Sequence, residues 1–394
     1  MSKKIIIGIT GSIAAFKSIQ LISDLLKQDY IVDVIMSESA AKFVTPVCIQ
    51  SLTKRKVYID TFDDENPAII THIDIVKDAD LFFVVPASAH TIAKLAYGLA
   101  DNMLTCAFLA ATCPKLIAPA MNVHMYENPI TQKNIQSLKD LGVYFVEPIQ
   151  GLLACGDVGN GKLADLDDLK EMIDYAICEK PLKGKKILIN AGPTQEAIDP
   201  VRYITNHSSG LMGYSLARAA FCLGADVTLV SGPTHLKKPY GVDFKTITSA
   251  SDMYNTIVPI ANQYDYIILS AAIADYTIPH ISDEKIKKSG DDLVLELSRT
   301  KDILKTIGEI KSDHQILCGF AMETQDLIEN ATKKLISKNA DMIVANSLKV
   351  EGAGFKGSTN VATLIKKDEI KELPLMSKSE LSYTILKELM KMEV

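Results

Sequence analysis

The feature that most constrains this chain is a strand, glycine turn and helix that occur in series twice. Apolar strands are predicted to begin at Lys3-Lys4-Ile5-Ile6-Ile7 and at Lys185-Lys186-Ile187-Leu188-Ile189, and a glycine turn and a helix follow each. Further strand-like runs lie between segments of helical periodicity, at 30–36, 81–85, 115–118 and 143–146, and again at 227–230, 266–269, 316–319 and 342–345. Strands that alternate with helices predict a parallel sheet with helices on both faces. The chain is therefore predicted to form two doubly wound, Rossmann-like α/β domains.

The boundary between the two domains is predicted near residue 182. The 394 residues, 47% of them hydrophobic, are enough for two separate cores. Segment 179–184 brings charge, proline and glycine together after an amphipathic helix predicted at 166–178. Such a segment is typical of a linker, so we expect domains at residues 1–180 and 181–394.

Charge, hydropathy and cysteine content exclude several classes of protein. The net charge is −6 and no basic stripe is present, which argues against a nucleic-acid partner. No apolar run reaches the roughly 18 residues of a membrane span. Lys3-Lys4 and the apolar run after them resemble a short signal peptide, but Lys17 and the amphipathic continuation favour a buried strand and a helix. Seven cysteines without CxxC spacing argue against a disulfide framework or zinc site. We expect a cytoplasmic protein.

The first candidate site lies where the predicted strands of the N-terminal half end. Segment 8–15 has neither the GxGxxG nor the GK[ST] spacing, yet it offers small residues, a hydroxyl and helix N-terminal amides. Ser37 and Ser88 follow two other strands, and ligands of such sheets bind beyond these strand ends. A mononucleotide site is predicted here, although a plain strand-turn-helix would look similar.

Three further features of the N-terminal half carry possible chemistry. His72 is a lone histidine suited to act as a general base, although most single histidines are structural. Asn122 follows a strand, where its amide can bind a carboxylate or cap the next helix. Segment 151–161 carries four glycines around Cys155, a composition typical of a flexible lid.

The C-terminal half has an unusually long loop after its first strand, at 191–210. Connections of this type normally have about 2–6 residues, so a longer one is functional or disordered, and its proline and apolar anchors argue against disorder. Within it, Arg202 and Asn206 can receive a phosphate and a reacting carbonyl. Lys334 and Lys338 lie four residues apart on one predicted helix face, and by itself the pair fits a solvated surface as well as a binding site.

Ten segments of this sequence, in order from residue 3 to about 389, carry a family resemblance. They read GITGSIAAFK, THID, PAS, GLADN, PAMN, ACGD, AGPTQEAIDPVRYITNHSSG, SAAIADY, EKIKK and GFAMET. The N-terminal half resembles the flavin-containing cysteine decarboxylases. The whole chain resembles the bacterial bifunctional phosphopantothenoylcysteine decarboxylase/phosphopantothenate–cysteine ligases of coenzyme A biosynthesis.

For the N-terminal half, the resemblance implies a flavodoxin-like domain that decarboxylates phosphopantothenoylcysteine to phosphopantetheine with FMN. The flavin would oxidise the thiol to a thioaldehyde, which accepts the electrons when CO₂ leaves, and would then reduce the resulting enethiol. His72 would assist proton removal, Asn122 would bind the carboxylate and Cys155 would donate the last proton. The residues implied to hold FMN are Gly11, Ser12, Ile13, Ser37, Ser88, Met103, Leu104 and Thr105.

For the C-terminal half, the resemblance implies activation of 4'-phosphopantothenate by CTP as an acyl-cytidylate, followed by attack of L-cysteine. The residues implied to bind phosphopantothenate are Arg202, Asn206, Ala271 and Ala272, with Asn206 catalytic. Those implied to bind CTP are Asp275, Lys285, Lys301, Asp302, Ile303, Leu304, Phe320, Lys334 and Lys338. Mg²⁺ would arrive with the triphosphate, since no carboxylate cluster is visible. At 300–303 the chain reads Thr-Lys-Asp-Ile where the family commonly has Asn-Pro-Asp-Ile.

The resemblance also implies a homo-oligomer built from decarboxylase trimers and ligase dimers. Two other classes of function stay open from the sequence. The N-terminal half could be a flavin prenyltransferase-like FMN protein, although that leaves PAMN, ACGD and the second domain unexplained. The chain could also be a regulatory module that binds a flavin or a nucleotide.

Overall fold

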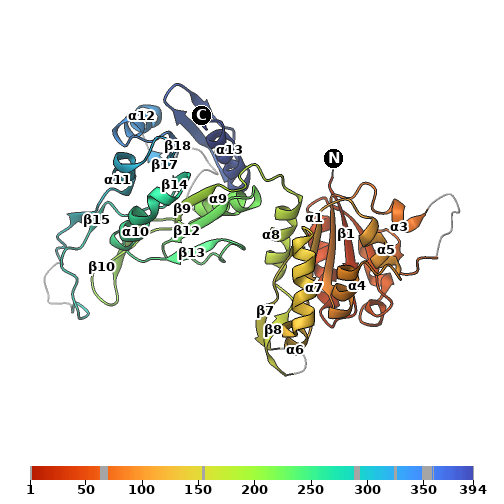
Figure 1. Cartoon of the computed structure of the whole chain (residues 1–394). Helices are drawn as coiled ribbons and strands as arrows, with labels where there is room; N and C mark the ends of the chain where they lie inside the picture. The colour runs from red at the N-terminus through yellow and green to blue at the C-terminus, as the bar shows by residue number, and fades with distance from the viewer. Residues whose placement is uncertain are drawn as a thin grey trace. The chain divides into compact units, whose positions relative to one another are not determined.

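The computed structural model describes residues 2–62, 70–152, 156–287, 293–323, 326–347, 357 and 359–393. It divides into two compact units, Met1–Cys178 and Glu179–Val394. Each unit is built around one large sheet (Figure 1). The prediction of two doubly wound α/β sheets is confirmed.

The N-terminal unit contains a six-stranded, wholly parallel sheet of order β3-β2-β1-β4-β5-β6. Its strands are β1 (Lys4–Ile9), β2 (Ile31–Met36), β3 (Val57–Tyr58), β4 (Leu81–Ala87), β5 (Lys115–Pro119) and β6 (Tyr144–Phe145). Without the two-residue edge strand β3, this is the 2-1-3-4-5 order of a flavodoxin. The chain reverses direction along the sheet between β1 and β4, and a ligand site is expected at such a point.

Helices cover both faces of this sheet (Figure 1). On one face are α1 (Ala15–Lys27) and α8 (Leu166–Ile177); on the other are α4 (Ala89–Tyr97), α5 (Met103–Ala110) and α7 (Pro129–Asp140). Because both faces are covered, β1 needs apolar residues throughout, and Ile5, Ile6 and Ile7 are fully buried. The remaining elements are short: 3-10 helix η1 (Ala40–Lys42), α2 (Pro46–Thr53), α3 (Thr71–Asp74), α6 (Val123–Glu127) and a hairpin of β7 (Ile149–Leu152) and β8 (Val158–Lys162).

The C-terminal unit contains an eight-stranded sheet of order β13-β12-β9-β14-β17-β18-β20-β21. Its strands are β9 (Lys186–Ala191), β12 (Asp226–Ser231), β13 (Asp243–Thr246), β14 (Tyr266–Leu269), β17 (Ile316–Glu323), β18 (Met342–Ser347), β20 (Ala362–Lys366) and β21 (Ile370–Glu372). The first six in spatial order are parallel, whereas β20 and β21 are antiparallel. The sequence did not predict this antiparallel edge, because a short hairpin carries no helix to mark it.

One face of this sheet packs on α9 (Leu211–Cys222) and α13 (Lys378–Met390). The other packs on α10 (Ala250–Ile257), 3-10 helix η2 (Val258–Gln263), α11 (Ile303–Ile310) and α12 (Leu327–Ser337). Three two-stranded ribbons complete the unit: β10 (Gln195–Ala197) with β11 (Tyr203–Thr205), β15 (Tyr276–Thr277) with β16 (Ser298–Arg299), and β19 (Thr359–Asn360) with β22 (Met376–Ser377). The long loop at 191–210 is therefore not irregular throughout, because it contains β10 and β11.

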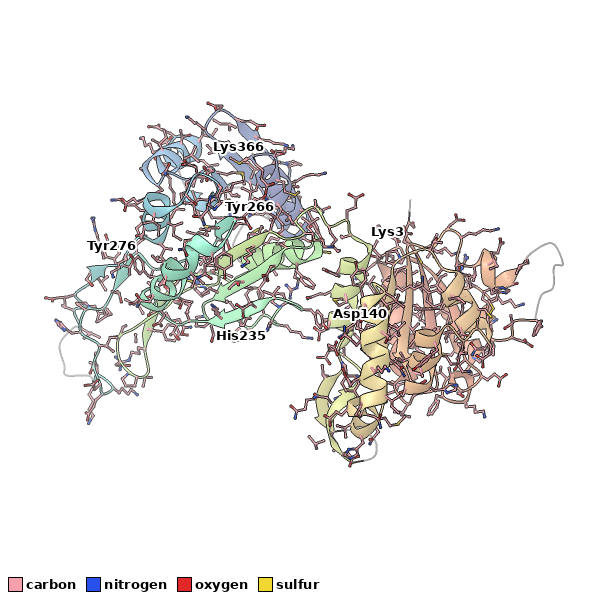
Figure 2. All side chains as sticks on the ribbon, in the orientation of Figure 1. Lys3, Asp140, His235, Tyr266, Tyr276 and Lys366 are labelled. Atoms are coloured by element: carbon pink, nitrogen blue, oxygen red, sulfur yellow. The ribbon has the colours of Figure 1, made fainter. Side chains whose placement is uncertain are left out.

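Ionic contacts fasten the C-terminal helix α13 to the sheet. The buried Glu388 carboxylate accepts hydrogen bonds from Lys366, Lys371 and Lys391 at 2.6, 2.9 and 2.8 Å. Tyr266 of the central strand β14 binds Glu393, which also pairs with Lys185 at 2.9 Å. Tyr266 and Lys366 are labelled in Figure 2. Among the described residues, every helix is too short or too polar to span a membrane.

Candidate functional site

A cavity of about 1000 Å³ lies beyond the carboxyl ends of the parallel strands in the N-terminal unit. The loops after β1, β2, β4 and β5 all contribute to it, which is the position expected where the strand order reverses. Eight of the residues predicted for the site line this cavity: Gly11, Ser12, Ile13, Ser37, Ser88, Leu104, Thr105 and Asn122. The tertiary structure thus brings together residues that are far apart in the sequence.

Hydrogen bonds between the ends of β1 and β4 fix the cavity floor. Thr10 donates its hydroxyl to the Pro86 carbonyl at 2.7 Å and accepts from the Ser88 amide at 2.9 Å. A Cβ atom on Gly11 would lie only 2.6 Å from the Cβ of Ser39. Glycine at position 11 therefore allows the two loops to approach closely, as a phosphate cradle made of backbone amides requires.

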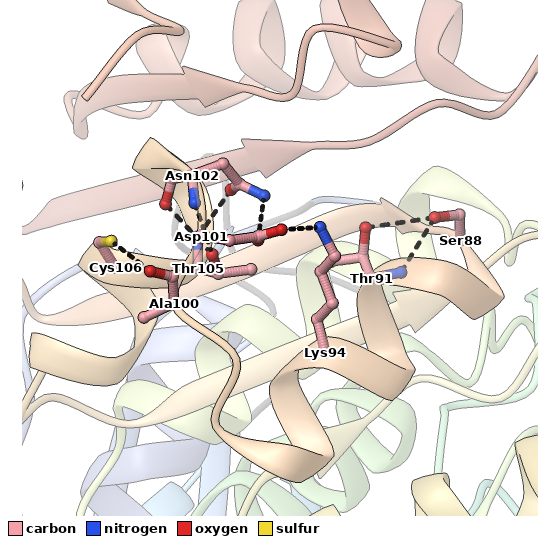
Figure 3. Close-up of polar contacts among 8 residues, drawn as sticks. All are labelled: Ser88, Thr91, Lys94, Ala100, Asp101, Asn102, Thr105 and Cys106. Atoms are coloured by element: carbon pink, nitrogen blue, oxygen red, sulfur yellow. Dashed lines mark hydrogen bonds and ion pairs between the residues drawn. The ribbon is translucent and has the colours of Figure 1, made fainter. Parts of the chain in front are cut away.

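A polar network borders the cavity between α4 and α5 (Figure 3). Ser88 caps α4 by accepting from the Thr91 amide, and Asn102 and Thr105 form a capping box at the start of α5. Between the helices, Lys94 pairs with Asp101 at 2.5 Å, and this hydrogen bond lowers the pKa of the Asp101 carboxyl. The network holds the 101–105 segment at the cavity rim with its polar groups already oriented.

Asn122 caps a helix and also lines the cavity. Its Oδ1 accepts from the His124 amide at 2.8 Å at the start of α6, and its Nδ2 donates to Asp157 at 2.9 Å. A substrate carboxylate only accepts hydrogen bonds, so the NH₂ end of the amide, which also donates to Asp157, is the part suited to bind it. Asp157 lies beside β8, which is itself held by a 3.0 Å hydrogen bond from the Met121 amide to the Gly161 carbonyl.

Two other predicted residues, His72 and Met103, do not line the cavity. His72 lies on α3, and its Nδ1 is buried with no hydrogen-bond partner among the described residues. Met103, the first residue of α5, points into the core and is fully buried. Cys155 lies outside the described residues, so its predicted place on a lid stays a prediction.

In the C-terminal unit, the candidate site gathers around segment 271–275, which follows β14. Side chains from three directions bind its backbone. Asn190 Oδ1 accepts from the Ala271 amide at 2.8 Å, and Thr194 Oγ1 accepts from the Ala274 amide at 3.0 Å. Asn206 Nδ2 donates to the Ala272 and Ile273 carbonyls, both at 3.2 Å. Asn206, Ala271 and Ala272, which were predicted to bind one substrate, are therefore adjacent.

The segment that departs from the family's motif is anchored to the same backbone. Thr300 donates its hydroxyl to the Ala274 carbonyl at 2.7 Å and its amide to the Asp275 carbonyl at 3.0 Å. The Lys301 ammonium lies 4.7 Å from the centre of the Tyr254 ring, within the range of a cation–π contact. Threonine thus supplies the link to 271–275, and lysine adds a positive charge beside it.

Two predicted cationic residues, Lys334 and Lys338, come from the end of α12, and Lys338 contacts the start of α11. Asp302 caps α11 through the Lys305 amide and pairs with Lys338 at 2.6 Å. Burial alone would raise the pKa of Asp302, but hydrogen bonds from Lys338 and the Lys305 amide outweigh it and lower the pKa. Lys334 donates to the Phe320 carbonyl at 2.9 Å.

The side chains of Ile303 and Leu304 are buried in the core, so only their backbone could contact a nucleotide. Arg202 and Lys285 lie on neighbouring segments, because Arg202 donates to the carbonyl of Ile286 at 2.7 Å. Sequence patterns did not single out Asp157, Asp199, Asn190 or Thr194. Asp157 lies inside the quoted segment ACGD, and Thr194 and Asp199 lie inside AGPTQEAIDPVRYITNHSSG, which is the signal that could have identified these three.

Comparisons with known proteins cover both units. A family model described as "Flavoprotein" matches residues 1–177, and one described as "DNA/pantothenate metabolism flavoprotein C-terminal domain" matches residues 182–392. The coenzyme A biosynthesis bifunctional protein CoaBC of Bacillus subtilis (strain 168) is 48% identical over 393 residues, which cover 98% of this chain and 97% of that protein. The protein of the same name from Vibrio cholerae is 42% identical over 386 residues, with coverage of 98% and 97%. A solved C-terminal domain of such a protein is 46% identical and covers 54% of this chain and 98% of its own, with a TM-score of 0.47.

Proposed function

This chain belongs to the family of coenzyme A biosynthesis bifunctional proteins and has its decarboxylase and ligase activities, and from that premise we propose how its two units divide the reactions. The C-terminal unit joins 4'-phosphopantothenate to L-cysteine with CTP and Mg²⁺. The N-terminal unit decarboxylates the phosphopantothenoylcysteine so formed, with FMN. The observation that carries the proposal is the convergence of predicted residues at the strand ends of each sheet.

The cavity of the N-terminal unit fits FMN on chemical grounds. The glycine turn at Gly11 leaves room for a phosphate next to backbone amides, and Ser12, Ser37 and Ser88 add hydroxyls. The capped 101–105 segment would border the flavin ring. When bound, FMN supplies the reversible two-electron oxidation that decarboxylation of this substrate needs.

The protein's own residues orient the substrate and move protons. Asn122 would bind the substrate carboxylate with its NH₂ end, because a carboxylate accepts hydrogen bonds and Oδ1 donates none. His72 would take a proton early in the reaction, and Cys155 would return one at its end. Placing a substrate carboxylate against fixed donors aligns it for CO₂ loss and excludes water.

A trimer of decarboxylase units would explain the position of His72. Its side chain does not line the cavity of its own subunit. The surface around α3 and α5 exposes Ile70, Ile73 and Leu109 at 60%, 39% and 61%. Exposed apolar groups of this size favour a subunit contact, through which His72 would reach a neighbouring cavity. Ligase units would pair as dimers, and a cytoplasmic location stays a prediction.

In the ligase unit, the backbone of 271–275 would receive phosphopantothenate, with Asn206 at its reacting carboxylate. Lys334 and Lys338 would bind the triphosphate, together with Lys285 and the amides at the start of α11. Lys338 is held by Asp302, so its ammonium is already placed before a nucleotide arrives. Asn206 would donate to the acyl oxygen as negative charge develops during attack by cysteine.

A coupled assay tests the whole proposal. The protein is incubated with 4'-phosphopantothenate, CTP, Mg²⁺ and L-cysteine, and phosphopantetheine is detected by mass spectrometry. Pyrophosphate release that needs both CTP and phosphopantothenate would identify the ligase step, and FMN released on heating would identify the cofactor. A protein that takes up no FMN would contradict the decarboxylase half. The flavin prenyltransferase alternative is not favoured, because similarity to the bifunctional relatives extends over both units.

A further inference from the structure

In the ligase unit, a tight turn at 198–202 is joined to the segment that carries Lys285, here called the Lys285 segment (residues 282–287). The Ser282 amide donates to the Ile198 carbonyl at 3.1 Å. The Ile286 amide donates to Asp199 Oδ2 at 3.2 Å, and the Ile286 carbonyl accepts from Arg202 Nη2 at 2.7 Å. Both polar groups of the Ile286 backbone, directly after Lys285, are thus bound by this turn.

The Asp199 carboxylate is the centre of this junction. Its side chain is 0% exposed. Oδ1 accepts from the Val201 and Arg202 amides, both at 2.8 Å, and so shapes the turn itself. Oδ2 faces the Ile286 amide and lies 3.6 Å from Arg202 Nε. One oxygen therefore builds the turn, and the other binds the Lys285 segment.

Burial by itself would raise the pKa of Asp199, but the three amide hydrogen bonds and the Arg202 guanidinium lower it. Asp199 is therefore an anion that accepts hydrogen bonds and donates none. Its inaccessible side chain cannot touch a substrate, so any effect on the reaction must pass through the segments it holds. Those segments carry Arg202 and Lys285.

We propose that Asp199 is a positioning residue of the ligase, which fixes the Lys285 segment so that the Lys285 ammonium is held ready for the nucleotide triphosphate. This inference rests on the proposed contact between Lys285 and CTP. It also assigns Arg202 a second task, because its guanidinium holds the Ile286 carbonyl of the same segment. Lys285 is exposed, and binding through an exposed charged side chain costs less ordering free energy when its backbone is already held in place.

The variant Asp199→Asn separates the two halves of the junction. Its Oδ1 can still accept from the Val201 and Arg202 amides, which keeps the turn. The Nδ2 group then replaces Oδ2 and faces the Ile286 amide and Arg202 Nε, which are both donors. If the side-chain amide of the Asp199→Asn variant were flipped, it would keep the bond to the Ile286 amide but lose the two bonds to the Val201 and Arg202 amides, which is less favourable. The variant should therefore fold normally and release only the Lys285 segment.

The expected result has a kinetic and a physical part. Asp199→Asn should raise the KM for CTP about tenfold, as expected for losing a hydrogen bond to a charged group. The KM for cysteine should stay unchanged. Hydrogen exchange should become faster at the Ile286 amide but not at the Val201 and Arg202 amides. Asp243→Asn, on an exposed strand of the same unit, is the matched control and should change none of these.

The decisive comparison uses Lys285→Ala alone and Lys285→Ala combined with Asp199→Asn. If Asp199 acts through Lys285, Lys285→Ala raises the KM for CTP, and adding Asp199→Asn raises it no further. A normal KM for CTP in Asp199→Asn, with an elevated one in Lys285→Ala, would overturn the positioning role. A normal KM in Lys285→Ala would instead refute the proposed nucleotide contact, and the inference with it. Unchanged exchange at Ile286 in Asp199→Asn would show that the carboxylate does not hold the segment.

Discussion

Replacing Asn206 by aspartate should separate the two steps of the ligase reaction. Asn206 is exposed, and its two hydrogen bonds to the Ala272 and Ile273 carbonyls are long, at 3.2 Å. Losing them costs stability of about 1 kcal/mol or less each, so the fold should survive. The reaction loses more, because removing one donor from a developing oxyanion costs roughly 10²–10³ in rate, or about 2.7–4 kcal/mol.

Activation of the carboxylate by CTP does not need that donor. Asn206→Asp should therefore still release pyrophosphate from CTP and phosphopantothenate, and then pass the acyl group to cysteine roughly 10²–10³ times more slowly. The acyl-cytidylate should accumulate with cysteine present and be visible by mass spectrometry. Asn255→Asp, on the exposed face of α10, is the control for the charge change.

Two results would refute this reasoning. Complete loss of pyrophosphate release would mean that Asn206 serves binding or activation. Kinetics like those of the unmodified protein would mean that Asn206 only ties its loop to the Ala272 and Ile273 carbonyls.

Three other predictions follow from the N-terminal cavity, the Glu388 cluster and the position of His72. Gly11→Ala should weaken FMN binding about tenfold, measured by flavin fluorescence, because the new Cβ would meet Ser39 at 2.6 Å; adding Ser39→Gly should restore binding. Three lysine hydrogen bonds lower the pKa of Glu388 to about 2. The ionised carboxylate therefore contributes fully to the free energy of unfolding above the usual pKa of 4.5, and this contribution is lost as the pH falls towards 2. Glu388→Gln should accordingly lower the free energy of unfolding, measured by urea titration, by roughly 1–3 kcal/mol at pH 7, a range that allows for screening of the partly exposed lysines. At pH 3 the loss should be smaller. Equal losses at the two pH values would count against an ionic origin. Two inactive variants, His72→Asn and Asn122→Ala, can be mixed and reassembled into shared oligomers. About a quarter of the decarboxylase activity should return if each site takes its His72 from a neighbouring subunit. No recovery would place both residues of a site in one subunit.

The arrangement of the two units separates binding from positioning. In each, groups proposed to touch substrates are held by side chains for which no substrate contact is proposed. Asp157 holds Asn122, and Asn190 and Thr194 hold segment 271–275. Substitutions at these supporting residues should therefore change geometry before they change affinity.

The amino-acid sequence by itself determined the fold class and the family. A strand covered by helices on both faces is apolar along most of its length, so the runs at 5–7 of β1 and 187–189 of β9 could be recognised without any partner in view. The turns after them, the Gly-rich segment at 151–161 and the long loop at 191–210 are where the sequence places the candidate sites. The family resemblance on ten quoted segments is confirmed by the relatives, and the residue roles drawn from it stay predictions.

Only the tertiary structure decided which of those residues meet. Asp199 and Ile286 are 87 positions apart, and Asn122 and Asp157 are 35 apart, so no local periodicity links them. The antiparallel strands β20 and β21, and the separation of His72 from its own cavity, likewise depend on how the chain closes on itself. Local patterns report which face of an element is buried, whereas contacts between distant loops depend on strand order and on the path of every connection between them.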